Sequence, residues 1–166
     1  MTGADAEAFA VFYKDNRGPV FRALLAGTLN RAAAEDATAE AFARAFADWP
    51  TVAAHPAPRA WVLRVAWNHA RSCWRTWEGR WAAGQPAPVP PAADWCADPD
   101  LVAAIRRLPP GQRQVLVWVA LGELTPAQTA KALGKADGTV RGQLARARAA
   151  LRQALAEDCD PEGRDG

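Results

Sequence analysis

The sequence predicts an all-α protein made of two small helical domains joined by an extended, proline-rich linker. Half of its 166 residues are apolar, the abundant Ala, Leu and Arg favour helix, and the β-branched and aromatic runs that strands require are missing. The stretch Gly79–Pro99 contains five prolines and no helical periodicity. Proline cannot continue a helix because it lacks a backbone donor and restricts the residue before it. We therefore expect domains at residues 1–78 and 98–156, a linker at 79–97 and a disordered acidic tail at 157–166.

Four helices are expected in the first domain. They run from about Ala4 to Asp15, onward from Gly18-Pro19, from about Ala33 to Phe46, and from about Pro58 to Trp77. The connecting segment 50–58 holds three prolines and should form a stiff loop. In the second domain we expect one helix ending at Leu108, another from Pro110 to Leu121, and then a helix pair.

The helix pair at residues 124–155 carries the clearest functional signal. Thr125 can cap a helix that begins at Pro126, with Gln128 in the capping-box position, and Gly134 supplies the left-handed backbone that ends it. The next helix begins near Asp137 and has an apolar stripe at helical spacing. This layout is typical of a helix-turn-helix, whose second helix reaches base edges while arginines contact phosphates. Its exposed surface is expected to present Arg141, Gln143, Arg146, Arg148 and Arg152.

The predicted helix 58–77 combines tryptophans with a polar stripe. At about 100° per residue, the stripe consists of Arg64, Asn68, Arg71 and Arg75. One interpretation is that these residues follow a nucleic-acid backbone while nearby rings or a rigid loop accept unstacked bases. The alternative is a core of tryptophans with solvated arginines.

The charge distribution favours a nucleic-acid partner for the second domain. Residues 98–156 carry a net charge of +5, whereas residues 1–77 carry +2 and the last ten carry −4. A basic excess of this kind is expected where a domain contacts phosphate.

Other classes of protein find little support in the sequence. The three cysteines have no metal-binding or disulfide spacing, and no phosphate-binding glycine loop appears. His55 and His69 have no catalytic partners at a recognisable spacing. The start of the chain lacks the features of a signal peptide, and no apolar run reaches the ~20 residues that span a bilayer. We expect a cytoplasmic, reduced protein that is not an enzyme, does not associate with a membrane, and needs no cofactor or metal.

Three segments carry a more specific signal: EDATAEAFARAF from Glu35, PRAWVLRVAWNHARSCWR from Pro58, and the long run from Leu108 to Leu151. Taken in this order, they resemble segments of the extracytoplasmic-function group of the sigma-70 family. These are similar to the family's polymerase-binding helix, promoter-melting helix and C-terminal DNA-binding domain. The similarity covers nearly all of residues 9–155, and three motifs in this order are far more specific than one.

The resemblance implies a role for particular residues. The clamp helices of core RNA polymerase would contact Glu35, Asp36 and Glu40, while Phe42 and Phe46 would be largely core. The loop Thr51–Arg59 would capture a flipped base of the minus-ten element. The nontemplate strand of promoter DNA would contact Arg59, Arg64, Asn68, Arg71 and Arg75. The minus-thirty-five element would be read by Thr139, Arg141, Gln143 and Arg146.

The resemblance also implies further partners. Part of the C-terminal domain would bind the polymerase flap, and an anti-sigma factor would be a possible regulator. The alternative is a stand-alone helix-turn-helix regulator that binds duplex DNA without polymerase. That alternative explains residues 124–155 but leaves the acidic helix, the Trp/Arg helix and the linker without a role.

Overall fold

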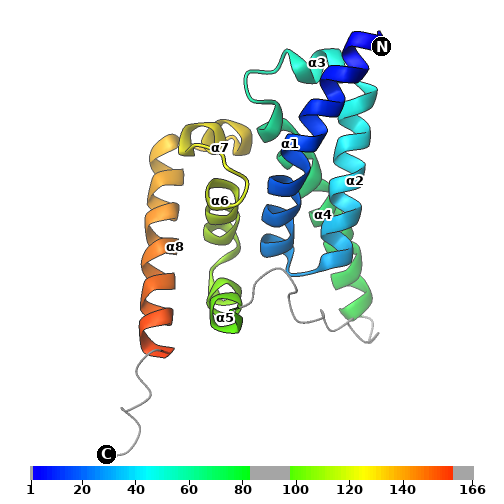
Figure 1. The fold of residues 1–166 in the computed structure, drawn as a ribbon. Helices are drawn as coiled ribbons and strands as arrows, with labels where there is room; N and C mark the ends of the chain where they lie inside the picture. The colour runs from blue at the N-terminus through cyan, green and yellow to red at the C-terminus, as the bar shows by residue number, and fades with distance from the viewer. Residues whose placement is uncertain (1, 83–97, 159–166) are drawn as a thin grey trace, which may run out of the picture.

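The computed structural model describes residues 2–82 and 98–158, and for residues 73–82 and 157–158 only the backbone. Every regular element in these ranges is an α-helix (Figure 1), which confirms the predicted fold class. The helices are α1 (Gly3–Thr28), α2 (Arg31–Ala47), α3 (Trp49–Ala53), α4 (Pro58–Ala82), α5 (Pro99–Arg107), α6 (Pro110–Ala120), α7 (Pro126–Leu133) and α8 (Asp137–Asp158). Within the described residues, no helix has the length and apolar character needed to cross a membrane.

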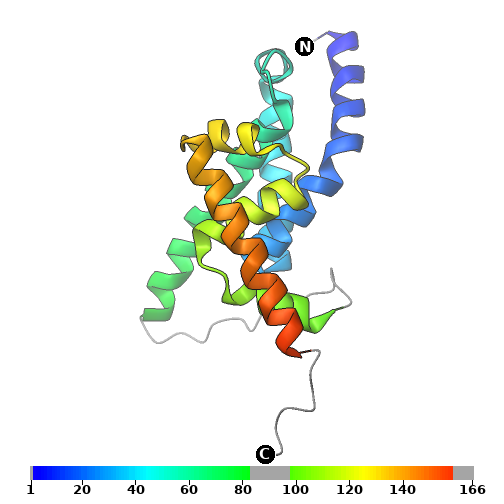
Figure 2. The same ribbon diagram turned by 90° about the vertical axis from the view of Figure 1, so that its left-hand side faces the viewer.

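Helix α1 is longer than predicted. It begins with a capping box between Thr2 and Asp5 and continues through Pro19, where we expected a break between two helices. That prediction is wrong because Gly18 has no Cβ to clash with the proline ring, which removes part of the usual penalty. Pro19 is also buried with Val20, so packing offsets the lost backbone hydrogen bond. Figure 2 shows the helix changing direction part-way along its length, as expected of a helix that contains proline.

The first four helices form the N-terminal domain, in which α1, α2 and α4 pack together. Asn30 caps α2 by accepting a hydrogen bond from the backbone of Ala33. Phe42 is buried as predicted, but Phe46 is 43% exposed, so its assignment to the core is wrong. Phe46 lies in the last turn of α2, where its ring has an edge contact with Phe9 at a centroid distance of 4.9 Å.

The segment 50–58 is only partly a loop. Pro50 stands in the first turn of the short helix α3, a position where its missing N–H costs nothing. Trp49 and Val52 of this helix are buried against the bundle. The stiff loop that we predicted is therefore confined to residues 54–57, between α3 and α4.

Helices α5 to α8 form the C-terminal domain around a small core of their own. The predicted apolar stripe of α8 supplies much of that core, since Val140, Leu144 and Ala147 are all buried there. The ends of two helices lie further along the chain than predicted: α4 continues to Ala82 and α8 to Asp158. The remaining residues of the predicted linker and tail, 83–97 and 159–166, lie outside the described residues.

The two domains pack against each other (Figures 1 and 2), through α1 with α6 and α4 with α7. Trp118 of α6 is fully buried, and its ring meets that of Trp67 of α4 edge-on, with 5.9 Å between centroids. Val117 and Leu124 join the same core as the N-terminal bundle. The described domains are therefore in direct apolar contact, an arrangement that no pattern in the sequence predicted.

Candidate nucleic-acid and polymerase interface

Helix α4 separates a packed side from a polar side. Val62, Leu63 and Ala66 are almost completely buried, and Trp67 is buried as well. Three members of the predicted polar stripe, Arg64, Asn68 and Arg71, are exposed. The fourth, Arg75, has a side chain that lies outside the described residues. The core side accounts for the folding of the helix, which leaves the exposed stripe free to contact a ligand.

Arg59, another member of the predicted DNA-binding set, has its guanidinium engaged by residues of both domains. Its Nε donates to Oδ1 of the buried Asn16, which itself donates from Nδ2 to the carbonyl of Phe12 at 2.7 Å. Its Nη1 donates to Oε2 of Glu123 at 2.6 Å. Only 25% of the Arg59 side chain is exposed. Residues of both domains therefore contact Arg59: Asn16 of α1 in the N-terminal domain and Glu123 of the α6–α7 turn in the C-terminal domain.

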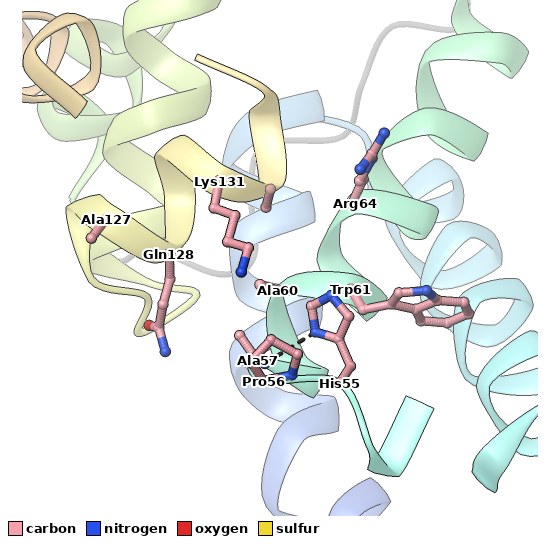
Figure 3. A pocket seen from close by; sticks show the side chains of 10 residues that line it. His55, Pro56, Ala57, Ala60, Trp61, Arg64, Ala127, Gln128 and Lys131 are labelled. Carbon is pink, nitrogen blue, oxygen red and sulfur yellow. Dashed lines mark hydrogen bonds between the residues drawn. The ribbon is translucent and has the colours of Figure 1, made fainter. Parts of the chain in front are cut away.

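The loop 54–57 and the start of α4 form one wall of a cavity of about 360 Å³. The His55 Nδ1 atom accepts a hydrogen bond from the backbone of Ala57 at 3.0 Å, which fixes the loop (Figure 3). Helix α7 forms the opposite wall, with Lys131 reaching toward the loop. The loop that we predicted to capture a base thus faces the first helix of the helix-turn-helix.

The helix-turn-helix has the predicted geometry. Thr125 and Gln128 form a capping box, with bonds of 3.1 Å and 2.9 Å between side chain and backbone. Gly134 ends α7 with φ at 64°, in the left-handed region that glycine adopts without strain. The small Ala130 is buried where α7 meets α8.

The first turns of α8 hold the side chains predicted to read DNA. Thr139, Arg141 and Arg146 are exposed. Arg141 donates to the Asp137 carboxylate one turn earlier, at 2.6 Å. Gln143 is half-buried and accepts a bond from the Lys135 ammonium group at 3.3 Å. Of the four predicted residues, Gln143 is the one whose side chain bonds the segment between α7 and α8, through Lys135.

The acidic residues of α2 are all at the surface and each has a basic neighbour. Glu35 accepts from Arg31 at 2.9 Å, and Glu40 accepts from Arg44 at 2.7 Å. Asp36 lies 2.7 Å from the Nε2 atom of His69 on α4. The arrangement gives the acidic face of α2 a defined orientation relative to α4.

Sequence reasoning missed the residues that connect the two domains at Arg59. Asn16 was not assigned a role, and neither were Arg22 and Glu123, which form a second ion pair at 3.8 Å. No sequence signal could have found them, because Glu123 lies 64 positions from Arg59.

A further basic residue, Arg113, has a structural role. Its Nη2 donates to the carbonyls of Arg106 and Leu108. The pKa of Arg113 is lowered, chiefly by burial and also by the nearby positive charge of Arg106.

Comparison with known proteins identifies the family. The model of sigma-70 region 2 matches residues 12–80, and that of sigma-70 region 4 matches residues 100–151. The RNA polymerase sigma-E factor of Streptomyces coelicolor is 33% identical in an alignment of 132 positions that covers 76% of this chain and 75% of that protein. The sigma-E factor of Streptomyces antibioticus is 32% identical in an alignment of 126 positions that covers 74% of this chain and 70% of that protein. The chain belongs to the extracytoplasmic-function group of the sigma-70 family.

Membership in this family defines the class of function. The chain is a sigma factor: it binds core RNA polymerase and promoter DNA, directs transcription initiation, and is not an enzyme.

Two solved structures share the fold of this sigma factor. The sigma factor RpoE, in complex with the anti-sigma factor NepR from Bartonella quintana, superposes with a TM-score of 0.75 at 19% identity, covering 90% of this chain and 98% of that chain. CnrH, in complex with the cytosolic domain of CnrY, gives 0.65 at 21% identity, with 92% and 90% covered. At these identities the likeness is evidence for the fold.

Proposed function

We propose that three separate surfaces of this sigma factor bind polymerase and the two promoter elements. The acidic face of α2 binds the polymerase clamp, the 54–57 loop with the α4 stripe takes the nontemplate strand of the minus-ten element, and the start of α8 reads the minus-thirty-five element. The observation that carries the proposal is the exposed stripe of α4, because Arg64, Asn68 and Arg71 play no part in the core of the helix that bears them.

The clamp surface consists of Glu35, Asp36 and Glu40. Exposed ion pairs are worth roughly 0–1 kcal/mol, so the pairs of Glu35 with Arg31 and of Glu40 with Arg44 are easily exchanged for pairs with polymerase. The contact of Asp36 with His69 is a hydrogen bond at the surface. The packed residues of α2, Ala37 and Ala41 among them, hold the helix in place while its acidic side changes partners.

The minus-ten surface combines cations with a rigid loop. Guanidinium groups bind phosphate through charge-assisted hydrogen bonds, and the arginines of the stripe recur along one side of α4. The His55–Ala57 bond stiffens the loop beside them, which favours the capture of an unstacked base by lowering the entropy that binding must remove.

The minus-thirty-five surface is the N-terminal part of α8. In helix-turn-helix proteins the residues there reach base edges in the major groove, and Thr139, Arg141 and Arg146 are the exposed candidates. Gln143 would contribute after its bond to Lys135 is exchanged for one to a base. Because neither the minus-ten surface nor the minus-thirty-five surface carries a large charge, we expect tight promoter binding only when polymerase holds these two surfaces on one DNA molecule.

We further propose that this sigma factor acts in the cytoplasm and is held inactive by an anti-sigma factor. Two proteins that share its fold were solved with protein partners, one of them named as an anti-sigma factor.

Run-off transcription from a genomic promoter library tests the proposal. The purified chain with core polymerase should yield discrete start sites that core polymerase alone does not, and failure to do so contradicts the function. Arg71→Gln should weaken promoter opening without affecting polymerase binding, with the exposed Arg17→Gln as a control for the loss of one charge. Equal opening by the two variants would remove the α4 stripe from the proposal.

A further inference from the structure

Two arginines of the N-terminal domain converge on one carboxylate of the C-terminal domain. Arg59 of α4 bonds one oxygen of Glu123 at 2.6 Å, and Arg22 of α1 faces the other oxygen at 3.8 Å. Arg59 is in turn oriented by the buried Asn16. A pair of guanidinium groups presented to two oxygens is the geometry by which proteins recognise phosphate as well as carboxylate.

The α6–α7 turn is built to deliver Glu123 to this position. Gly122 packs so tightly that an added Cβ would lie 2.8 Å from Leu63 Cδ1 and 2.6 Å from the carbonyl of Trp118. Leu124 is buried in the shared core, and its N–H donates to the carbonyl of Trp118 at 3.2 Å. Between these two anchors, Glu123 has φ at 55°, a left-handed conformation that is uncommon for a residue with a side chain. Strain of this kind persists only where the surroundings enforce it.

We propose that Arg22 and Arg59 form a phosphate-binding site for the promoter strand, and that Glu123 occupies this site as an intramolecular competitor in the free chain. This proposal rests on the proposed function, which assigns Arg59 but not Arg22 to DNA. In the free chain Glu123 bonds Nη1 of Arg59 at 2.6 Å and only 25% of the Arg59 side chain is exposed, so a phosphate would compete with Glu123 for this guanidinium. DNA gains access to the site when the turn leaves it.

Apolar residues around the buried Trp118 pack the two domains together. The Arg22–Glu123 pair, which is half exposed, adds little to that contact. Glu123 therefore competes with phosphate for the two arginines. The apolar packing of Trp118, Leu124 and their neighbours determines how often the α6–α7 turn lies over the site. Removal of the carboxylate should abolish the competing negative charge without unfolding either domain.

The experiment measures binding of a short fluorescent single-stranded DNA to the full chain over a range of salt concentrations. For single strands, the slope of log affinity against log salt changes by about −0.7 for each phosphate contacted. Glu123→Gln should therefore bind more tightly than the wild type and steepen the slope by about 0.7, for the one phosphate that the two arginines would hold. The exposed Glu7→Gln carries the same change in net charge and should leave the slope unaltered.

A second variant tests whether Arg22 belongs to the site. Adding Arg22→Gln to Glu123→Gln should return about half of the steepening. An unchanged slope in Glu123→Gln, or no measurable DNA binding by it at low salt, overturns the competition, and an unchanged slope on adding Arg22→Gln removes Arg22. Run-off transcription by the same proteins separates this outcome from failure of the proposed function, because a chain that selects start sites and yet shows no slope change contradicts only the competitor.

Discussion

Gly27 lies where the two domains meet, and its replacement by alanine should destabilise the protein. An alanine Cβ there would lie 2.3 Å and 2.4 Å from two ring carbons of Trp67, and 3.4 Å from a methyl group of Val117. The ring of Trp67 cannot simply rotate away, because it is buried and its edge-on neighbour is the fully buried Trp118. The clash must therefore displace α1, α4 or the C-terminal domain.

The size of the effect follows from two opposing terms. Alanine in place of glycine stabilises a helix by about 0.5–1 kcal/mol, and at most that near the end of α1. Overpacking a core costs about 1–3 kcal/mol, with rigid aromatic contacts at the upper end. We expect Gly27→Ala to lower the free energy of unfolding by about 1–2 kcal/mol.

Gly142 in α8 provides a matched control. The nearest atom to its added Cβ is the flexible end of Arg146, at 3.3 Å. Gly142→Ala should therefore raise the free energy of unfolding by about 0.5–1 kcal/mol, through helix propensity alone. Urea unfolding followed by circular dichroism measures the free energy of unfolding of both variants, provided that their m-values equal that of the wild type. A Gly27→Ala protein as stable as the wild type would refute the packing argument.

Three further predictions concern the cap and the proposed surfaces. Thr125→Ala removes the capping box of α7 and should cost about 1 kcal/mol of stability by the same unfolding assay; a cost near zero would mean that water replaces the cap. Asp36→Lys should weaken binding to core polymerase in a pull-down titration, with Glu7→Lys as the control, and equal affinity of the two variants would remove Asp36 from the clamp surface. Joint replacement of Arg141 and Gln143 by alanine should change which promoters are used in the run-off library without lowering polymerase affinity. An unaltered promoter set would place minus-thirty-five recognition elsewhere.

Local sequence patterns predicted the helical fold and most of the helix ends. Capping residues act on the backbone within one turn, so Thr125, Gln128 and Gly134 marked the limits of α7 directly. The apolar spacing of α8 likewise predicted which residues are buried, since Val140 and Leu144 face the core of the C-terminal domain. Prediction failed at Pro19, where tertiary packing outweighed a local rule.

The candidate site was likewise predicted only in part. Helical periodicity placed Arg64, Asn68 and Arg71 on one exposed stripe, because residues on one helix keep a known angular relation. Periodicity contains no information about contacts between distant segments. The meeting of Arg59 with Glu123, and of Trp67 with Trp118, depends on how two helical domains pack across a linker.

The sequence by itself thus determined the all-helical fold class, the helix-turn-helix and the family. Only the tertiary structure decided which basic residues are exposed and which are covered, because that depends on the apolar surface that each domain buries against the other.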